Sequence, residues 1–290
     1  MLAYLEYMDK YFAVYNAEVV ASKVLLSNID DVIMYPYLRT EVDSMHKMYL
    51  VSPDHGRSYV VGKHNNRFVV SKGNGLSYTT HIFLNTMEFG NDTWGLLLKQ
   101  DAIRDFIIGN EVRELGIKTN NMECVLELDR QITLQNEVRL NPVLLQYNVE
   151  CPYRISDTAF MTREMITQWA NKWASEFSKE YKYRYQIASD VLIHNLYILQ
   201  KNGILHNAIT PQNYTWALEL LDFEIAHSPN YPYGTEDKNR HVLDLFSREI
   251  IYTYQIIILI AWHLKETIDY KWVEKIFISY GFDLKKYLVI

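Results

Sequence analysis

The spacing of hydrophobic residues changes near the middle of the chain. In the first half, short apolar runs are separated by turn residues: MYLV, SYVV and RFVV between Lys47 and Ser71, then VLELD, QITLQ and PVLLQYN from Cys124 onward. Such runs are typical of strands, and Gly62 to Asn66 fits a hairpin connection. Between the two groups, Asp101 to Leu115 carries a helical stripe, and Gly116 follows as a stop signal. The first half therefore predicts a sheet with one helix.

Beyond Pro152 nearly the whole pattern is helical. Helices are expected over Thr162 to Tyr181, Ile187 to Asn202, Arg248 to Leu264 and Trp272 to Tyr280. The change falls within residues 147 to 156. We predict an α+β protein of two lobes: residues 1–150 form an N-terminal extension and a small mixed β-sheet plus helix lobe, and residues 151–290 form a larger, mostly helical lobe. Residues 1 to 45 show short apolar helical patterns with no assigned role.

Composition and charge limit the classes of binding partner that we expect for the chain. The 290 residues are 49% apolar and 22% charged, as in an ordinary globular protein. A net charge of -6 without a basic tract argues against nucleic-acid binding. The N-terminal segment is acidic, which argues against a secretory signal. The apolar run from Ile250 to Leu264 is shorter than the ~20 residues of a membrane span, so it does not indicate membrane insertion. Cys124 and Cys151 form no CxxC pair, so we expect reduced thiols and a cytoplasmic location.

A lysine and a glutamate in the first half are candidates for an ion pair. Lys72 ends a predicted strand immediately before Gly73, Asn74 and Gly75. Glu111 lies four residues after Ile107 on the predicted helix, so it falls on the apolar face. A carboxylate on that face is costly unless it is paired, although a glutamate at the edge of the stripe could also extend to solvent. A strand-end lysine followed by such a helix resembles the Lys–Glu pair of a protein-kinase small lobe, where the lysine holds nucleotide phosphates.

The segment from Leu205 to Ala226 places oxygen ligands at kinase-like spacing. His206 precedes Asn213 by seven positions, and Asn213 precedes Asp222 by nine. Mg²⁺ prefers carboxylate and amide oxygens, so Asn213 and Asp222 are the candidate metal ligands, with Mn²⁺ as an alternative ion. Each residue could instead cap a turn, and His206 is expected to be structural. HNAITPQN and LLDFE resemble the kinase catalytic loop and D-F-G segment.

This kinase-like pattern departs from a kinase at three positions. Ala208 replaces the aspartate that accepts the substrate proton, Asn207 replaces the adjacent arginine, and Glu224 replaces the D-F-G glycine. The motifs nevertheless imply a protein-kinase-like fold. The chemistry, however, must work without the usual base.

The chain more closely resembles the selenoprotein O (SelO) family of kinase-fold pseudokinases that transfer AMP. The similar motifs are Lys72-Gly73-Asn74-Gly75, Arg104-Asp105-Phe106 with Glu111, LGIKT, and the loop ending at Asn213. The resemblance implies ATP in a flipped orientation and AMP transfer to a Ser, Thr or Tyr hydroxyl. It also implies nucleotide contacts from Lys72, Gly73, Glu111, Arg154 and Asn213, with Lys72 and Asp222 as catalytic residues.

Two substitutions distinguish the chain from that family. Gln146 stands where a second phosphate-binding arginine is expected, and Gln212 stands where the family has an aspartate beside the metal-binding asparagine. Three functions therefore stay open: transfer of AMP from Mg-ATP to a protein or peptide hydroxyl, phosphoryl transfer to a peptide or small molecule, and a catalytically inactive nucleotide-binding scaffold. The expected partners are ATP and a protein or peptide acceptor, with neither nucleic acid nor membrane.

Overall fold

The computed structural model divides into two compact units. It describes all residues except 1–7, 9, 29, 41, 52–56, 76–94, 134–138, 177–180, 234–235 and 288–290. The first unit contains residues 1–106 and 120–152, and the second contains 107–119 and 153–290. The change at Pro152 and Tyr153 lies inside the range expected for the lobe boundary. The second half of helix α3 (Lys99–Glu114), expected in the first lobe, belongs to the second unit.

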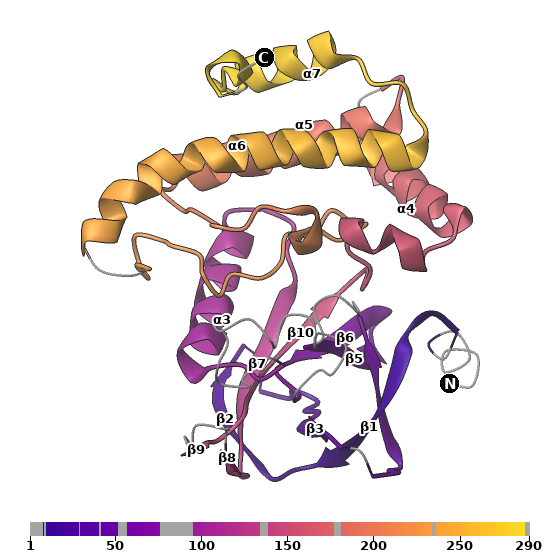
Figure 1. Ribbon diagram of the computed structural model, residues 1–290, viewed down its shortest axis with the longest axis vertical. Helices are drawn as coiled ribbons and strands as arrows, with labels where there is room; N and C mark the ends of the chain where they lie inside the picture. The colour runs from indigo at the N-terminus through magenta and orange to yellow at the C-terminus, as the bar shows by residue number, and fades with distance from the viewer. Residues whose placement is uncertain are drawn as a thin grey trace. The chain divides into compact units, whose positions relative to one another are not determined.

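The first unit is built on an eight-stranded sheet in the order β2-β7-β10-β6-β5-β4-β1-β3, in which every pairing is antiparallel (Figure 1). Its strands are β1 (Ala13–Val19), β2 (Ser22–Ser27), β3 (Tyr37–Arg39), β4 (His46–Leu50), β5 (Ser58–His64), β6 (Arg67–Lys72), β7 (Asn121–Leu128) and β10 (Val143–Val149). A separate two-stranded ribbon joins β8 (Ile132–Thr133) to β9 (Arg139–Leu140). The expected small lobe of sheet plus helix is confirmed, with more strands than the sequence pattern predicted.

The hairpin between β5 and β6 follows from its turn residues. His64 pairs with Arg67, which leaves Asn65 and Asn66 as a two-residue turn with φ of 49° and 62°. Asparagine tolerates this left-handed backbone better than most residues, and two such residues in succession match the twist of the flanking strands. The hairpin predicted at Gly62 to Asn66 is therefore confirmed, with its turn at the last two positions.

Residues 13 to 39 correct the interpretation of the N-terminal segment. They form β1, β2 and β3 rather than short helices, and β2 pairs with β7 while β1 pairs with β4. These strands are partly exposed, so their hydrophobic alternation is weak: within β1 only Ala17 is buried. Ala17 then packs in a cluster with Met48, Leu50 and Tyr59. Burial of that cluster, rather than the pattern of hydrophobic residues within β1, stabilises the strand in the sheet.

The second unit is mostly helical, as predicted. It contains the short helix η3 (Ile155–Phe160), α4 (Arg163–Glu176), α5 (Arg184–Lys201), the single turn η4 (Pro211–Asn213), α6 (Glu236–Leu264), α7 (Tyr270–Ser279) and η5 (Leu284–Lys286). Helices α5 and α6 pack along one another (Figure 1). The α+β class, with one sheet-containing part and one helical part, is confirmed. In the part of the chain that the structure describes, no helix is both long and apolar enough to span a bilayer.

Candidate nucleotide and metal site

Lys72 ends a central strand of the first unit and is fully buried. Its strand β6 is paired on both sides, with Ser58 of β5 and Leu145 of β10 opposite Lys72. The Nζ atom lies 3.0 Å from Oδ2 of Asp105 on α3, and the two side chains are 2% and 1% exposed. Burying two charges is costly unless they are well paired, so this ion pair fixes the lysine in the sheet interior.

The carboxylate partner of Lys72 is a correction, because Glu111 was expected in that role. Glu111 instead accepts a hydrogen bond from Asn230 at 2.8 Å. The buried face of α3 carries Ala102, Asp105 and Val112, whereas Glu111 is only half-buried. Six helical positions separate the two acids, which places them about 120° apart around the axis. The stripe in the sequence therefore predicts the wrong buried face for α3, and Asp105, within the Arg-Asp-Phe triplet, is the acid on the buried face.

Gly73 has a backbone reason for being glycine. Its φ of +97° lies in the region that side chains disfavour, and an added Cβ would meet the carbonyl oxygen of Val143 at 2.5 Å. Its N–H donates to the carbonyl of Arg57 at 2.9 Å. The N–H of this residue, which was expected to contact a nucleotide, therefore already has a backbone hydrogen-bond partner within the first unit.

His206 holds the kinase-like loop of the second unit together. Its Nε2 lies 2.8 Å from the carbonyl of Leu221, and its Nδ1 accepts from the Ala208 N–H at 3.2 Å. These two bonds fit the neutral ring with its proton on Nε2. The ring is fully buried and packs edge-on against Phe223. The geometry is that of a structural residue joining the loop to the segment before Asp222.

Asn213 and Asp222 are brought to neighbouring backbone positions. The Leu221 N–H donates to the Asn213 carbonyl at 2.8 Å, so the residue before Asp222 lies opposite Asn213. The Asn213 amide nitrogen donates to Ala208 at 2.9 Å, which leaves its Oδ1 oriented by the loop. Asp222 is half-buried with φ of +69°, a backbone region that aspartate tolerates better than most residues.

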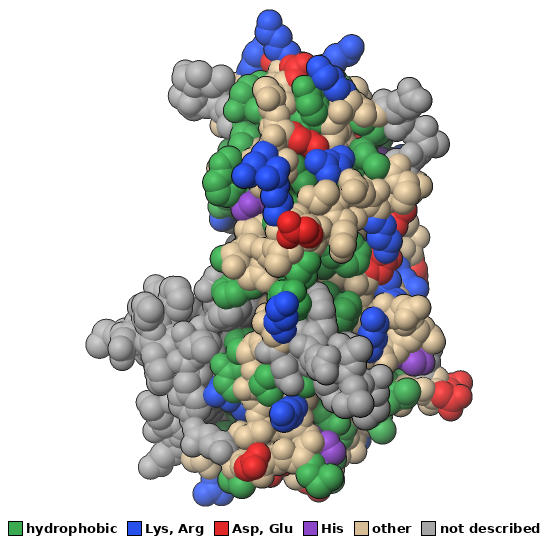
Figure 2. Space-filling model, turned by 90° about the vertical axis from the view of Figure 1, so that its right-hand side faces the viewer, with side chains coloured by type: hydrophobic (Ala, Val, Ile, Leu, Met, Phe, Trp, Pro, Cys, Tyr) green, Lys and Arg blue, Asp and Glu red, His purple; other side chains and the backbone are tan. Residues whose placement is uncertain are grey.

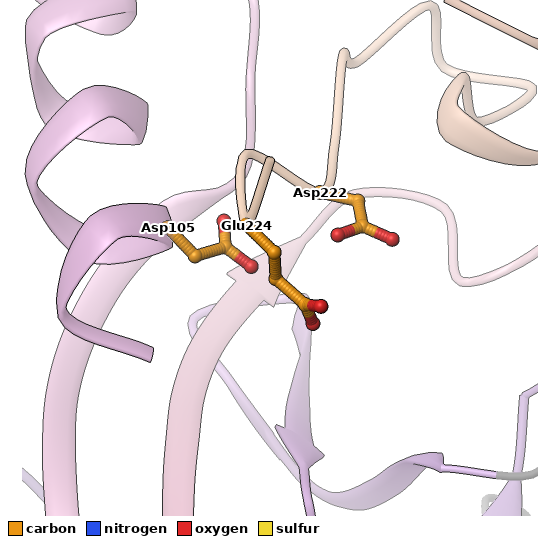
Figure 3. A group of neighbouring side chains, drawn as sticks. All are labelled: Asp105, Asp222 and Glu224. Atoms are coloured by element: carbon orange, nitrogen blue, oxygen red, sulfur yellow. The ribbon is translucent and has the colours of Figure 1, made fainter. Parts of the chain in front are cut away.

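Glu224 adds a second carboxylate beside Asp222. The two carboxylates approach within 4.8 Å of one another, and Figure 3 shows both on the same short segment. Glu224 is 8% exposed. The sequence contained a signal, because Glu224 follows Asp222 by only two positions and so must lie near it. By comparison with a kinase motif, the sequence predicts only a departure from the D-F-G glycine at this position, and no ligand.

Arg154 is a buried cation beside Asn213. It is 3% exposed, and its Nη1 donates to the Gln212 carbonyl at 2.8 Å and lies 3.4 Å from Asn213 Oδ1. Its Nε has no hydrogen-bond partner, and no carboxylate of the described residues forms an ion pair with it. A buried guanidinium without a carboxylate is unusual, and it suits a site that receives an anion.

Gln146 has a structural role in the first unit. Its amide nitrogen donates to Glu123 at 2.7 Å and to the Ile33 carbonyl at 2.6 Å, and its oxygen accepts from the Tyr35 N–H at 3.0 Å. It is 1% exposed. All three partners lie within the unit, so this side chain joins the sheet to residues 33–35.

Glu249, on α6, accepts a hydrogen bond from the kinase-like loop, and the sequence analysis did not predict this role. Its Oε1 accepts from the Asn207 N–H at 2.7 Å, where Asn207 has φ of +70°. Burial raises the pKa of the Glu249 carboxyl to about 8, against the lowering effect of backbone hydrogen bonds from Asn207 and His206. The sequence around Glu249 gives no signal for this role, because the hydrogen-bond partner Asn207 lies 42 residues earlier in the chain.

Comparison with known proteins adds little to this geometry. No family model matches the chain, and no curated protein matches it. The chain is similar to a solved structure described as the crystal structure of a Toxoplasma gondii specific rhoptry antigen kinase domain, with a TM-score of 0.39 and 9% sequence identity. That similarity covers 85% of this chain and 79% of the other. A functional assignment therefore has to be based on the side chains described above.

Proposed function

We propose that the chain is an Mg-ATP-dependent transferase with a kinase-like site that moves AMP to a protein or peptide hydroxyl. The observation that carries the proposal is the loop of the second unit, where His206 and the Leu221–Asn213 bond bring Asn213 and Asp222 together. Lys72, held by Asp105 in the first unit, would supply positive charge for the ATP phosphates.

The donor set fits a hard divalent cation. Asn213 contributes an amide oxygen, and Asp222 and Glu224 contribute carboxylates within 4.8 Å of each other. Mg²⁺ prefers such oxygen ligands and keeps waters in its other positions, and Mn²⁺ accepts the same set. When bound, the ion would neutralise phosphate charge. The chain's own contribution is to hold these oxygens in a fixed orientation.

Arg154 favours AMP transfer over phosphoryl transfer. Its buried guanidinium beside Asn213 suits the outer phosphates, which would then form the leaving group. In this reaction the acceptor hydroxyl oxygen attacks the α-phosphorus, the bond from that phosphorus to the β-bridging oxygen breaks, and pyrophosphate leaves. The hydroxyl proton passes to solvent, because Ala208 occupies the position of the kinase base.

Labelled ATP tests the reaction. With Mg²⁺ and candidate acceptor proteins, label from the α-phosphate should appear on protein, and γ-label should not. Asp222→Asn and Arg154→Met should each lower transfer at least tenfold, whereas Glu114→Gln, at an exposed position of α3, should leave it unchanged. Retention of the γ-label alone would replace the proposal by phosphoryl transfer.

The rival assignment is a nucleotide-binding scaffold without chemistry. Ala208 and Gln212 favour it, since neither supplies a base, and so does Gly73, whose N–H is occupied by Arg57. Stabilisation of the chain by ATP with Mg²⁺, but no label on any protein from either phosphate, would support the scaffold.

A further inference from the structure

The second unit contains a cavity of about 260 Å³ among α4, α5 and the turn at Ala217 and Leu218. Every residue that lines it belongs to this unit. For scale, an apolar protein cavity of about 150 Å³ holds one benzene molecule. The cavity in the second unit is therefore large enough for two fused aromatic rings with a short side chain.

Much of the cavity wall is apolar and aromatic. Trp173 of α4 is 1% exposed, and Ala217 and Leu218 of the turn are also buried. Val191 of α5 and Tyr280 contribute further apolar surface to the lining. Walls of this kind favour an aromatic ligand, because a flat ring packs closely against indole and aliphatic groups.

Contacts within the unit hold these walls in place. Trp173 donates from its indole nitrogen to the Trp216 carbonyl at 2.8 Å, and the two rings stack with their centroids 5.7 Å apart. Thr215 Oγ1 accepts from the Ala217 N–H at 3.1 Å, which orients the turn. A ligand therefore does not have to order the walls on binding, and this lowers the entropic cost of association.

The acids and lysines at the cavity are paired with groups of the protein. Glu176 lies 3.7 Å from Lys118 and 3.8 Å from Lys172. Asp190 accepts a hydrogen bond from the Tyr181 hydroxyl at 2.5 Å. Two acids thus stand with two lysines, so the site presents no net charge to a ligand of either sign. Acidic and basic side chains are interspersed in a similar way over the helical part of the face drawn in Figure 2.

The other polar side chains of the lining also have partners. Asn195 is hydrogen-bonded to Tyr214, and the His194 ring packs edge-on against Tyr280 with the centroids 5.8 Å apart. A charged ligand would lose hydration here and would find, among the described lining residues, no acid or lysine without a partner. An uncharged ligand loses little hydration and still gains contact with the apolar walls.

We propose that this cavity binds an uncharged bicyclic aromatic molecule, with its rings packed against Trp173, Val191 and Leu218. The lining residues are separate from those assigned to ATP and metal. The proposal therefore does not rest on the proposed transfer reaction.

Tryptophol, tryptamine and indole-3-acetate test the selection of an uncharged ligand, because they share the indole ring and a short side chain but differ in charge. Calorimetric titration at pH 7 should give saturable binding of the neutral tryptophol, in the millimolar range or tighter. Both charged molecules should bind at least about fivefold more weakly, because each loses hydration without gaining a counter-charge. Absence of saturable tryptophol binding, or equal or tighter binding of either charged molecule, would overturn the proposal.

A cavity-filling variant tests the location of the site. Val191→Phe should weaken tryptophol binding at least about tenfold, which corresponds to about 1.4 kcal/mol. Val24→Phe, at an exposed position of β2, is the matched control and should leave the affinity unchanged. A folded Val191→Phe variant that binds tryptophol like the wild type would contradict the assignment.

Photolabelling of the wild type locates the site even if Val191→Phe does not fold by circular dichroism. The neutral probe 5-azidoindole should label peptides from residues 163–201 or 214–220, and excess tryptophol should prevent this labelling. Label found only on other peptides would overturn the proposal.

Discussion

Replacing Glu249 by glutamine tests whether a buried carboxyl supports the kinase-like loop. Burial raises the pKa of this carboxyl from 4.5 to about 8. Because the folded pKa lies above the unfolded one, the folded protein binds the proton more tightly. The stabilisation is complete below pH 4.5, declines as the pH rises through this window, and is lost above pH 8.

The pKa shift of Glu249 sets the size of the pH-dependent change in stability. A difference of about 3.5 units, from 4.5 to about 8, corresponds at roughly 1.4 kcal/mol per unit to at most about 5 kcal/mol in the free energy of unfolding. Glutamine keeps a side-chain oxygen that can accept from the Asn207 N–H, but it carries no charge at any pH. The Glu249→Gln variant should therefore be less sensitive to pH than the wild type.

Urea unfolding at pH 5, 6, 7 and 8 measures the effect. The difference in unfolding free energy, variant minus wild type, should rise steadily across the series by several kcal/mol. Glu114→Gln, at an exposed position, is the control and should show no such trend. A Glu249→Gln difference that is constant between pH 5 and 8 would refute the reasoning, because it would mean that the carboxyl titrates equally in both states.

Two further predictions concern the first unit. Lys72→Met should lower the free energy of unfolding by about 3–5 kcal/mol, because it leaves Asp105 buried without its partner, and Lys72→Met combined with Asp105→Leu should recover part of that loss. Urea unfolding measures the free energy of unfolding of both variants. As a control, Glu111→Gln should lower this free energy by less than about 1 kcal/mol. If Glu111→Gln costs more than Lys72→Met, the assigned Lys72–Asp105 pair is contradicted. Gly73→Ala should cost about 2 kcal/mol or more in thermal unfolding, since it combines a positive φ with a contact to Val143. An unchanged melting temperature would contradict that account.

Most helix positions and core strands could be predicted from local pattern, because each carries its own periodicity; the exception among the helices is α6, expected from Arg248 but beginning at Glu236. The strands before residue 40 could not, since β1 has a single buried residue and depends on its neighbours in the sheet. The buried face of α3 could not be predicted for a related reason. Ile103 and Ile107 suggested the buried face, yet both are half-buried, while the charged Asp105 lies inside because Lys72 pairs with it. A hydrophobic stripe alone cannot reveal a buried ion pair.

The candidate site was predictable where spacing along the chain determines it. His206, Asn213 and Asp222 belong to one continuous loop, so their order and separation already implied contact, and the Leu221–Asn213 bond agrees with that. Glu249 was not predictable, because its role depends on where α6 packs under the loop. Glu224 was predictable in principle, because it follows the candidate ligand Asp222 by two positions, but the resemblance to D-F-G predicts only a missing glycine there.

The central claim, a nucleotide and metal site on the loop of Asn213 and Asp222, is tested most directly by calorimetric titration of ATP with and without Mg²⁺. Wild-type chain should bind ATP in a Mg²⁺-dependent manner, and Asp222→Asn should weaken that binding at least tenfold while Glu114→Gln leaves it unchanged. Binding of equal strength with and without Mg²⁺, or in wild type and Asp222→Asn, would contradict the assignment.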